Sequence, residues 1–257
     1  MASVEAWLDR LYVGAEGATL REEERRKAHQ VSAMLEEVRR ALRWLGRREP
    51  LLLVDAAAGK AYLGLLAARL VLEPLGIPGR VITIEREAAR VAASVQAHER
   101  VGTHIDVECR AGDVGDVSVW PREPSLVVAL HACGPAADAI IDASIAVRAR
   151  GVLLVPCCAS RAMAVAQRAD AVAEGRGIPR HAPVRRRFVQ ALVDAERTWR
   201  LESAGFQTEV VEFVGGLVTP HNLLWRARHV GEPRRMHRAR KALEQVLAWP
   251  AIPDPVS

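Results

Sequence analysis

The sequence predicts an α/β protein whose Rossmann-like sheet has seven strands, helices on both faces and a helical extension at its N-terminus. From residue 51 onward, apolar strand-like segments alternate with amphipathic helical segments. The strands are almost continuously apolar, which is typical of parallel strands buried on both faces. The last two strand-like segments are joined by a loop too short for a helical crossover, so they must pair antiparallel. These three observations predict a parallel sheet that ends in an antiparallel hairpin.

The predicted elements follow one another in chain order. Residues 3–48 carry apolar positions at helical spacing. Strands are predicted at 51–55, 80–85, 104–110, 125–131, 151–158, 207–216 and 221–229. Helices are predicted at 60–73, 87–100, 135–148, 160–173 and 184–204, and in the second of these Ala88, Val91, Ala92 and Val95 are expected to face inward. We divide the chain into a helical extension (1–48), a central α/β domain (49–230) and a basic C-terminal helix and tail (231–257).

Composition narrows the class of protein. No run approaches the roughly 20 apolar residues that span a bilayer, and the first residues lack the apolar segment of a secretory signal. The four cysteines lie in apolar contexts without a CxxC pair, so we expect reduced thiols in a cytoplasmic protein. A net charge of +5 suits a nucleic-acid partner, but nearly all of the 36 basic residues are arginine, as a GC-rich coding sequence also produces. No membrane partner and no obligate protein partner is evident.

The segment LLLVDAAAGKAYLG is the most informative part of the chain. Asp55 ends a buried strand, Ala57, Gly59 and Ala61 carry almost no side chain, and a helix starts after Lys60. Such a turn brings backbone N–H groups and a helix N-terminus close to a ligand, as nucleoside cofactors require. Alanine suits the loop if small size for close approach matters more than positive φ. Asp55 is expected to bind loop N–H groups or a water, and Lys60 either holds an anionic group or is simply exposed.

Two acidic positions strengthen the cofactor hypothesis. Glu85 ends the second predicted strand, where a carboxylate can accept hydrogen bonds from both ribose hydroxyls, although it could also be an exposed strand-end glutamate. Asp113 follows the third predicted strand, with apolar Val114 after it. As an alternative to a role in ligand binding, Asp113 is an ordinary loop aspartate.

Taken in chain order, the loop at 55–61, Glu85 and Asp113 resemble the motifs of the class I S-adenosylmethionine-dependent methyltransferases. Asp55-Ala-Ala-Ala-Gly59 is similar to their Asp-x-Gly-x-Gly loop, and the antiparallel hairpin distinguishes this group from ordinary dinucleotide-binding folds. The resemblance implies S-adenosylmethionine as the cofactor. The residues implied to bind it are Asp55, Ala57, Gly59, Lys60, Glu85, Asp113, Val114 and Leu130.

Reactive side chains are expected where the fourth and fifth strands end, because reacting groups gather at this edge of a doubly wound sheet. The fourth strand ends in Leu130-His131-Ala-Cys133-Gly, and the fifth ends in Pro-Cys157-Cys158. His131 has a pKa suited to a general base, or it shapes the pocket wall. We expect the three cysteines to line the substrate pocket. As an alternative, they could converge with His131 into a zinc site, but adjacent cysteines point in different directions on a strand, so we expect no metal.

A late Thr219-Pro-His-Asn222-Leu segment completes a closer resemblance. Together with the Leu-His-x-Cys-Gly and Cys-Cys strand ends, it looks like one branch of the group, which contains tRNA 2′-O-methylases and a set of methyltransferase-like domains. The similarity covers roughly residues 48–229 in motif order. It implies that Asn222 orients the acceptor and that Thr219 contacts it, whereas ordinary turn chemistry is the alternative.

The sequence therefore predicts an enzyme that transfers a methyl group to an O or N nucleophile, with RNA, and tRNA in particular, as the leading acceptor. Two arginine-rich stretches could carry RNA phosphates or could be solvated helix faces: residues 185–187 and 234–241. The chain lacks the N-terminal zinc fingers expected of the eukaryotic tRNA enzymes, which favours a protein or small-molecule acceptor as the alternative. A non-catalytic cofactor-binding scaffold is a further alternative. A NAD-dependent enzyme is disfavoured by the hairpin and by the single glycine of the loop.

Overall fold

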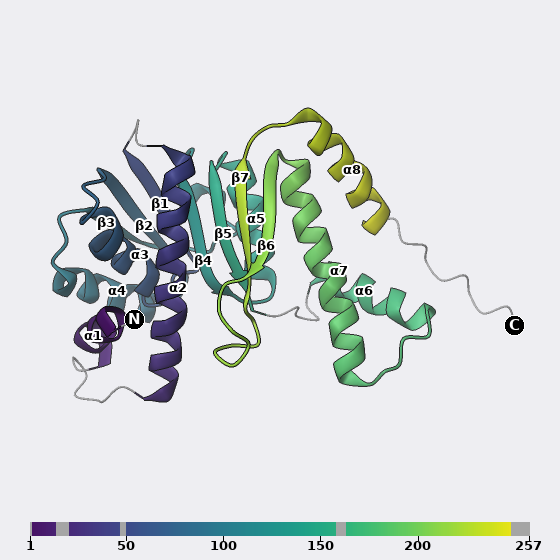
Figure 1. Cartoon of the computed structure of the whole chain (residues 1–257), viewed down its shortest axis with the longest axis horizontal. Helices are drawn as coiled ribbons and strands as arrows, with labels where there is room; N and C mark the ends of the chain where they lie inside the picture. Colours follow the sequence, from purple (N-terminus) through teal and green to yellow (C-terminus); the bar gives the residue numbers. More distant parts are fainter. Residues whose placement is uncertain (1, 14–20, 47–49, 158–162, 248–257) are drawn as a thin grey trace, which may run out of the picture.

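The computed structural model describes residues 2–13, 21–46, 50–157 and 163–247. Figure 1 shows a seven-stranded sheet with helices on both sides, in the order β3-β2-β1-β4-β5-β7-β6, which confirms the predicted α/β, Rossmann-like fold. The first five strands are parallel, β7 runs antiparallel to β5, and β6 runs antiparallel to β7. The strand bounds are Leu51–Ala56 (β1), Gly79–Glu85 (β2), Asp106–Ala111 (β3), Leu126–Ala132 (β4), Gly151–Pro156 (β5), Phe206–Glu212 (β6) and Leu223–His229 (β7).

The helices lie close to where the sequence predicts them. Their bounds are Ala2–Leu8 (α1), Glu22–Leu45 (α2), Tyr62–Ala67 (α3), Ala88–Val101 (α4), Pro135–Ala146 (α5), Ala164–Gly175 (α6), Ala182–Ser203 (α7) and Pro233–Leu247 (α8). Short π-helical segments extend α1 at Asp9–Val13 and α3 at Ala68–Leu72. The N-terminal region is therefore not one regular helix, and residues 14–20 and 47–49 lie outside the described part.

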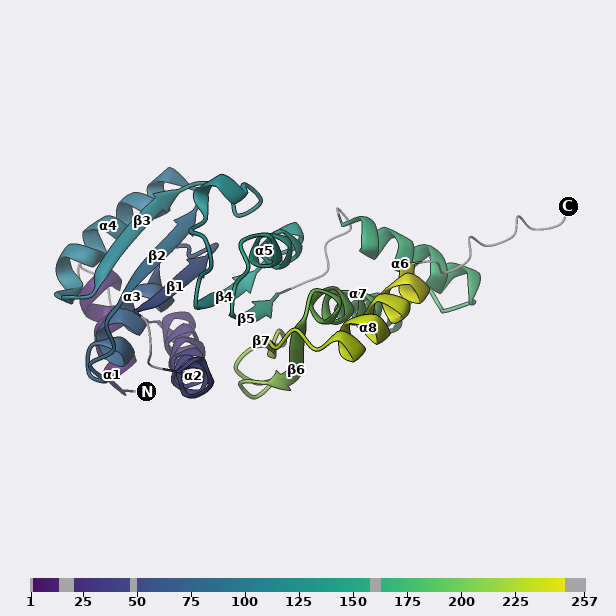
Figure 2. The same ribbon diagram turned by 90° about the horizontal axis from the view of Figure 1, so that it is seen from above.

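The two faces of the sheet bury separate apolar clusters. Helices α1 to α4 pack on one face, where buried side chains of α2 such as Met34 and Val38 meet sheet residues such as Leu53 and Leu126. Helices α5 and α7 cover the other face around the fully buried Trp225 (Figure 2). Alternate strand residues supply the two clusters because successive side chains of a strand point to opposite faces.

Helix α4 differs from its predicted orientation. Its buried residues are Ser94, Ala97 and Val101, whereas Val95 is 45% exposed. The prediction that Ala88, Ala92 and Val95 face inward was wrong, since all three are exposed, because the N-terminal half of α4 does not pack on the sheet. Instead, Glu87 before the helix and Arg90 in its first turn border a cavity.

The C-terminal helices form a lobe beside the hairpin. Helix α8 packs along α7, and α6 packs against α7 at its N-terminal part (Figures 1 and 2). Arg197 of α7 is fully buried and donates from Nε to Asp138 of α5 at 2.8 Å, so an ion pair ties this lobe to the sheet domain. In the part of the chain that the structure describes, no helix has the length and apolar character needed to cross a membrane.

Candidate functional site: a cofactor cavity beside a second cavity

The turn after β1 has the backbone conformation of a close-approach loop. Ala57, Gly59 and Ala61 all have positive φ, at 54°, 60° and 58°. The expectation that small size alone admits alanine here was therefore incomplete, because two alanines adopt the left-handed conformation, which costs roughly 1–2 kcal/mol per non-glycine residue. Backbone hydrogen bonds stabilise the loop, since Ala58 N donates to the carbonyl of Ile84 at 3.0 Å.

Glu85 joins this loop to the end of β2. Its Oε2 accepts a hydrogen bond from the N–H of Gly59 at 2.8 Å, and its Oε1 accepts one from the N–H of Glu87 at 2.9 Å. The residue is only 6% exposed, so it is not the exposed strand-end glutamate of the alternative interpretation. A carboxylate offers roughly four lone-pair sites, so each oxygen retains one for a ligand.

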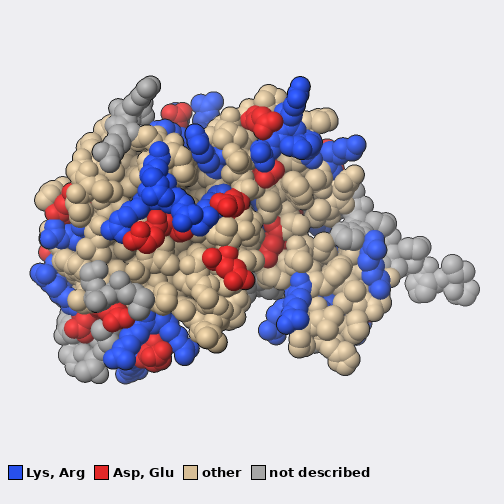
Figure 3. Space-filling view, in the orientation of Figure 1, with Lys and Arg blue, Asp and Glu red and all other residues tan. Residues whose placement is uncertain are grey.

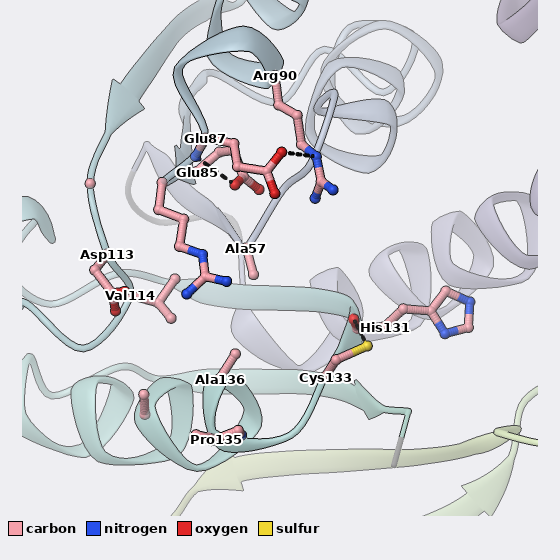
Figure 4. A pocket seen from close by; sticks show the side chains of 13 residues that line it. Ala57, Glu85, Glu87, Arg90, Asp113, Val114, His131, Cys133, Pro135 and Ala136 are labelled. Atoms are coloured by element: carbon pink, nitrogen blue, oxygen red, sulfur yellow. Dashed lines mark hydrogen bonds and ion pairs between the residues drawn. The ribbon is translucent and has the colours of Figure 1, made fainter. Parts of the chain in front are cut away.

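A cavity of about 460 Å³ opens at the carboxyl ends of the first four strands. Figure 4 shows its lining side chains, which come from the loops after β1 to β4 and from the start of α5. This is the edge where open α/β sheets bind ligands, and the volume lies in the range of small-molecule pockets. The predicted residues that line it are Ala57, Glu85, Asp113, Val114, His131 and Cys133.

Seven lining residues were not identified from the sequence. They are Arg86, Glu87, Arg90, Gly112, Pro135, Ala136 and Ala139. Arg86, Glu87 and Gly112 lie within two residues of a predicted strand end, and this adjacency was the available signal; the other four lie in α4 and α5. Among them, Arg90 and Glu87 form an ion pair at 2.9 Å on the rim of the cavity.

The loop after β3 supplies a mixed polar and apolar wall. Asp113 is exposed, and its Oδ1 accepts a hydrogen bond from the N–H of Gly115 at 2.8 Å. Val114 is buried, and its carbonyl accepts a hydrogen bond from the Trp120 indole at 3.0 Å, which fixes the loop. An acidic group therefore lies next to an apolar surface, as the sequence predicts for a nucleoside base.

Four of the predicted cofactor residues do not line this cavity: Asp55, Gly59, Lys60 and Leu130. Asp55 is buried, and its Oδ2 accepts a hydrogen bond from the N–H of Gly64 at 2.8 Å, so it anchors α3 to β1. Burial raises the pKa of Asp55 to about 7. The carbonyl of Lys60 accepts a hydrogen bond from the Tyr12 hydroxyl at 2.6 Å. Leu130 packs against the apolar cluster beneath α1 to α4.

His131 lies where strand β4 changes its pairing register. Its φ is +64°, and the register with β5 shifts between Leu130 and Ala132. Figure 4 shows the imidazole pointing away from Cys133 and toward α2, where its Nε2 contacts the side-chain oxygen of Gln30. Burial, and then the nearby His221 and Lys27, lower the pKa of His131, so the neutral ring is favoured.

The cysteines form a disulfide that the sequence analysis did not predict. Cys133 after β4 and Cys157 after β5 are bonded, with Cα atoms 5.1 Å apart. The expectation of reduced thiols was wrong for this pair, because neighbouring strand ends bring the two side chains together. Cys109 is free, and burial raises the pKa of its thiol. Cys158 lies outside the described residues, and within them no group of three or more metal-binding side chains gathers.

A second cavity, of about 700 Å³, lies on the other side of this disulfide. Cys133 lines the first cavity and Cys157 the second. Asn222 also lines the second cavity, and its Nδ2 donates to the carbonyl of Val214 at 3.0 Å. Thr219 is buried in the turn, where its Oγ1 accepts a hydrogen bond from the N–H of His221. The Thr219 side chain therefore stabilises the turn, whereas Asn222 lies at the wall of the second cavity.

Together, the strand order, the antiparallel hairpin and the cavity at the strand ends define a class I S-adenosylmethionine-dependent methyltransferase. A family model described as a methyltransferase domain matches residues 26–164, more than half of the chain. The chain belongs to this family of methyltransferase domains.

Two solved structures that are similar to this chain are methyltransferases by their descriptions. Magnesium protoporphyrin IX methyltransferase from Synechocystis, solved with bound S-adenosylhomocysteine, is 13% identical with a TM-score of 0.50, over 83% of this chain and 90% of that one. A putative caffeoyl-CoA O-methyltransferase from Staphylococcus aureus is 12% identical with a TM-score of 0.49, over 89% of this chain and 92% of that one. At 13% identity, the likeness to the Synechocystis enzyme concerns the fold alone. A comparison with curated proteins finds no significant match.

The side chains that line the first cavity fit S-adenosylmethionine. A buried carboxylate at Glu85 can accept from ribose hydroxyls, and Asp113 with Val114 offers a polar and an apolar contact for the base. Close approach of the ligand to the backbone is possible at Ala57, where the side chain is a single methyl group. The cavity therefore has the size and the chemistry that this cofactor needs.

Proposed function

We propose that the chain transfers the methyl group of S-adenosylmethionine to an oxygen or nitrogen atom of RNA, with tRNA as the leading acceptor. The observation that carries this proposal is the pair of cavities that meet at the disulfide Cys133–Cys157, one suited to the cofactor and one bearing arginines. The net charge of +5 and the resemblance of the strand-end motifs to tRNA 2′-O-methylases support RNA as the acceptor. A protein or small-molecule acceptor is the alternative, and the experiment below separates them.

The chain's own residues have three tasks in such a reaction. When bound, the cofactor supplies a methyl group on a sulfonium, so that transfer breaks the carbon–sulfur bond, forms a carbon–oxygen or carbon–nitrogen bond and leaves S-adenosylhomocysteine. Glu85 and Asp113 hold the nucleoside part. Alignment of the acceptor falls to the wall that contains Asn222.

The remaining task is to remove a proton from the nucleophile. His131 suits it because its lowered pKa keeps the ring in the neutral, proton-accepting form at neutral pH. His221, one of the nearby groups that lower the pKa of His131, lines the second cavity. A His131→Gln variant should lose most of the rate with little change in cofactor affinity.

Transfer of a labelled methyl group tests the proposal directly. The native protein is incubated with labelled S-adenosylmethionine and with separate RNA, protein and metabolite fractions, and we expect label in RNA, within tRNA. Label only in protein or metabolites would refute the RNA acceptor.

Calorimetry tests the cofactor site in parallel. Glu85→Ala removes a buried charged acceptor and should weaken S-adenosylmethionine binding about tenfold or more, since hydrogen bonds to charged groups contribute roughly 1.5–3 kcal/mol. Glu212→Ala, an exposed glutamate on β6, is the control and should bind as the native protein does. Equal affinity in both variants would remove Glu85 from the site.

A further inference from the structure

The second cavity has a distinct composition. It lies between the end of β5, the N-terminal part of α7 and the start of β7, and its polar lining is Arg186, Arg187, Gln190, Asp194, His221 and Asn222. In Figure 3 the molecular outline is notched between the β6–β7 loop and the start of α7, and the lobe of α6 and α7 shows basic side chains with little acid beside them. A volume of about 700 Å³ is ample for one nucleotide.

Two arginines of α7 stand apart from the other arginines of that helix. Arg185 binds Asp170 and the carbonyl of Ile178 within the lobe, whereas Arg197 binds Asp138 and Arg200 binds Asp142, both of α5, so that they tie the lobe to the sheet domain. Arg186 and Arg187 are exposed at the cavity and have no ion pair or hydrogen bond with any described residue. Their charges are therefore available to a ligand.

The two arginines are not offset by acidic side chains nearby in α7. The first turn of the helix contains no acidic residue. Asp194, the acidic residue of the lining, is already compensated, because Gln190 donates to it at 2.8 Å and Arg197 lies 3.6 Å away. The local excess of positive charge at the mouth has no counterpart among the described residues.

We propose that the second cavity is the acceptor site and that Arg186 and Arg187 bind phosphates that flank the nucleotide to be methylated. This rests on the proposed function, and it names the part of the acceptor that the chain recognises: a phosphate-bearing nucleotide of single-stranded or looped RNA, presented to the cofactor cavity beside the disulfide. Arginine suits this role because its planar guanidinium binds phosphate oxygens in pairs.

The test compares two double variants with the same change of charge. Arg186→Gln with Arg187→Gln alters the cavity mouth, and Arg234→Gln with Arg238→Gln alters exposed positions of α8 that have no partner among the described residues. Binding of a tRNA transcript to the full chain is followed by fluorescence anisotropy at several salt concentrations. The first variant should bind at least tenfold more weakly, and the slope of log K against log salt should fall by about 1.4, since each single-strand phosphate contact contributes about 0.7.

The outcomes separate this proposal from the proposed function. Loss of binding and of methyl transfer confined to the α7 variant, with native cofactor affinity by calorimetry, supports the phosphate site. If the native protein methylates RNA and the two variants lose affinity equally, the cavity is not the phosphate site although the function stands. If the native protein does not methylate RNA, the proposed function fails, whatever the variants do.

Discussion

Asp55 should make the stability of the protein fall as pH rises, and Asp55→Asn should remove that dependence. Burial raises its pKa from 3.8 to about 7, so the folded protein retains a proton that the unfolded chain loses. Between about pH 4 and pH 7 the unfolded state therefore binds fewer protons, and the free energy of unfolding decreases with pH. Above pH 7 both states are ionised, and the effect no longer grows.

The magnitude follows from the shift. Roughly three pKa units at about 1.36 kcal/mol each correspond to about 4 kcal/mol of lost stability above pH 7. Between pH 5 and pH 8 the part that is measurable is roughly 2–3 kcal/mol. Asparagine carries no charge and can still accept the hydrogen bond from Gly64. The stability of the Asp55→Asn variant relative to the native protein should therefore rise by roughly 2–3 kcal/mol between pH 5 and pH 8.

Urea unfolding at pH 5, 6, 7 and 8 and constant ionic strength measures the difference between the two proteins. Taking the difference cancels the other groups that titrate, including Asp194, whose pKa burial raises to about 6. Asp106→Asn, which removes an exposed carboxylate from β3, is the control and should give a difference that does not change with pH. The reasoning fails if the Asp55 difference is equal at pH 5 and pH 8, or if it falls.

Three further predictions concern packing and cross-links. Gly64→Ala should destabilise the protein by about 1–2 kcal/mol in urea unfolding, because the added β-carbon would lie 3.0 Å from a buried side chain of β2. Arg226→Ala should lower the free energy of unfolding by about 3 kcal/mol in the same assay. The carboxylate of Glu37 is 8% exposed, and it would lose the pair of hydrogen bonds that it accepts from Arg226 at 2.7 and 2.8 Å. The double variant Arg226→Gln with Glu37→Gln should recover much of that loss. Cys133→Ala should lower stability by about 3 kcal/mol in oxidising buffer, because it opens a loop with a sequence separation of 24 to Cys157, and the two proteins should converge in reducing buffer.

The sheet order and the cofactor edge were predictable because they depend on patterns that the sequence displays. Apolar runs followed by helical periodicity predict parallel strands, and a polar residue at a strand end is carried to the same edge as its neighbours. Glu85 and Asp113 were found in this way. The arginines at 186 and 187 were visible as a charge run, but only the position of α7 against β7 distinguishes two unpaired side chains from those that hold the lobe.

The orientation of His131 and the disulfide were not predictable for a different reason. The ring turns toward α2 because the backbone takes a φ of +64° where the register with β5 shifts, and no local pattern signals that irregularity. Neighbouring strand ends predict that Cys133 and Cys157 approach each other, but whether two sulfurs bond depends on the Cα separation and on the directions of the Cβ vectors. Sequence reasoning places side chains at an edge and does not orient them there.

The alanines of the first loop do not argue for a lost activity. Left-handed φ costs Ala57 and Ala61 roughly 1–2 kcal/mol each, whereas glycine at either position would lose roughly 0.4–1 kcal/mol to the larger entropy of the unfolded chain. The net penalty of alanine is therefore between about 0 and about 1.6 kcal/mol per position, which at most matches the lower end of the roughly 1.5–3 kcal/mol that a hydrogen bond to a charged group contributes. The Glu85 carboxylate makes such a bond to Gly59, and the buried Asp55 side chain accepts a further hydrogen bond from Gly64 near the start of α3. A loop held at both ends by buried acidic side chains retains its shape without glycine at every turn position, which is the condition for binding a cofactor along its backbone.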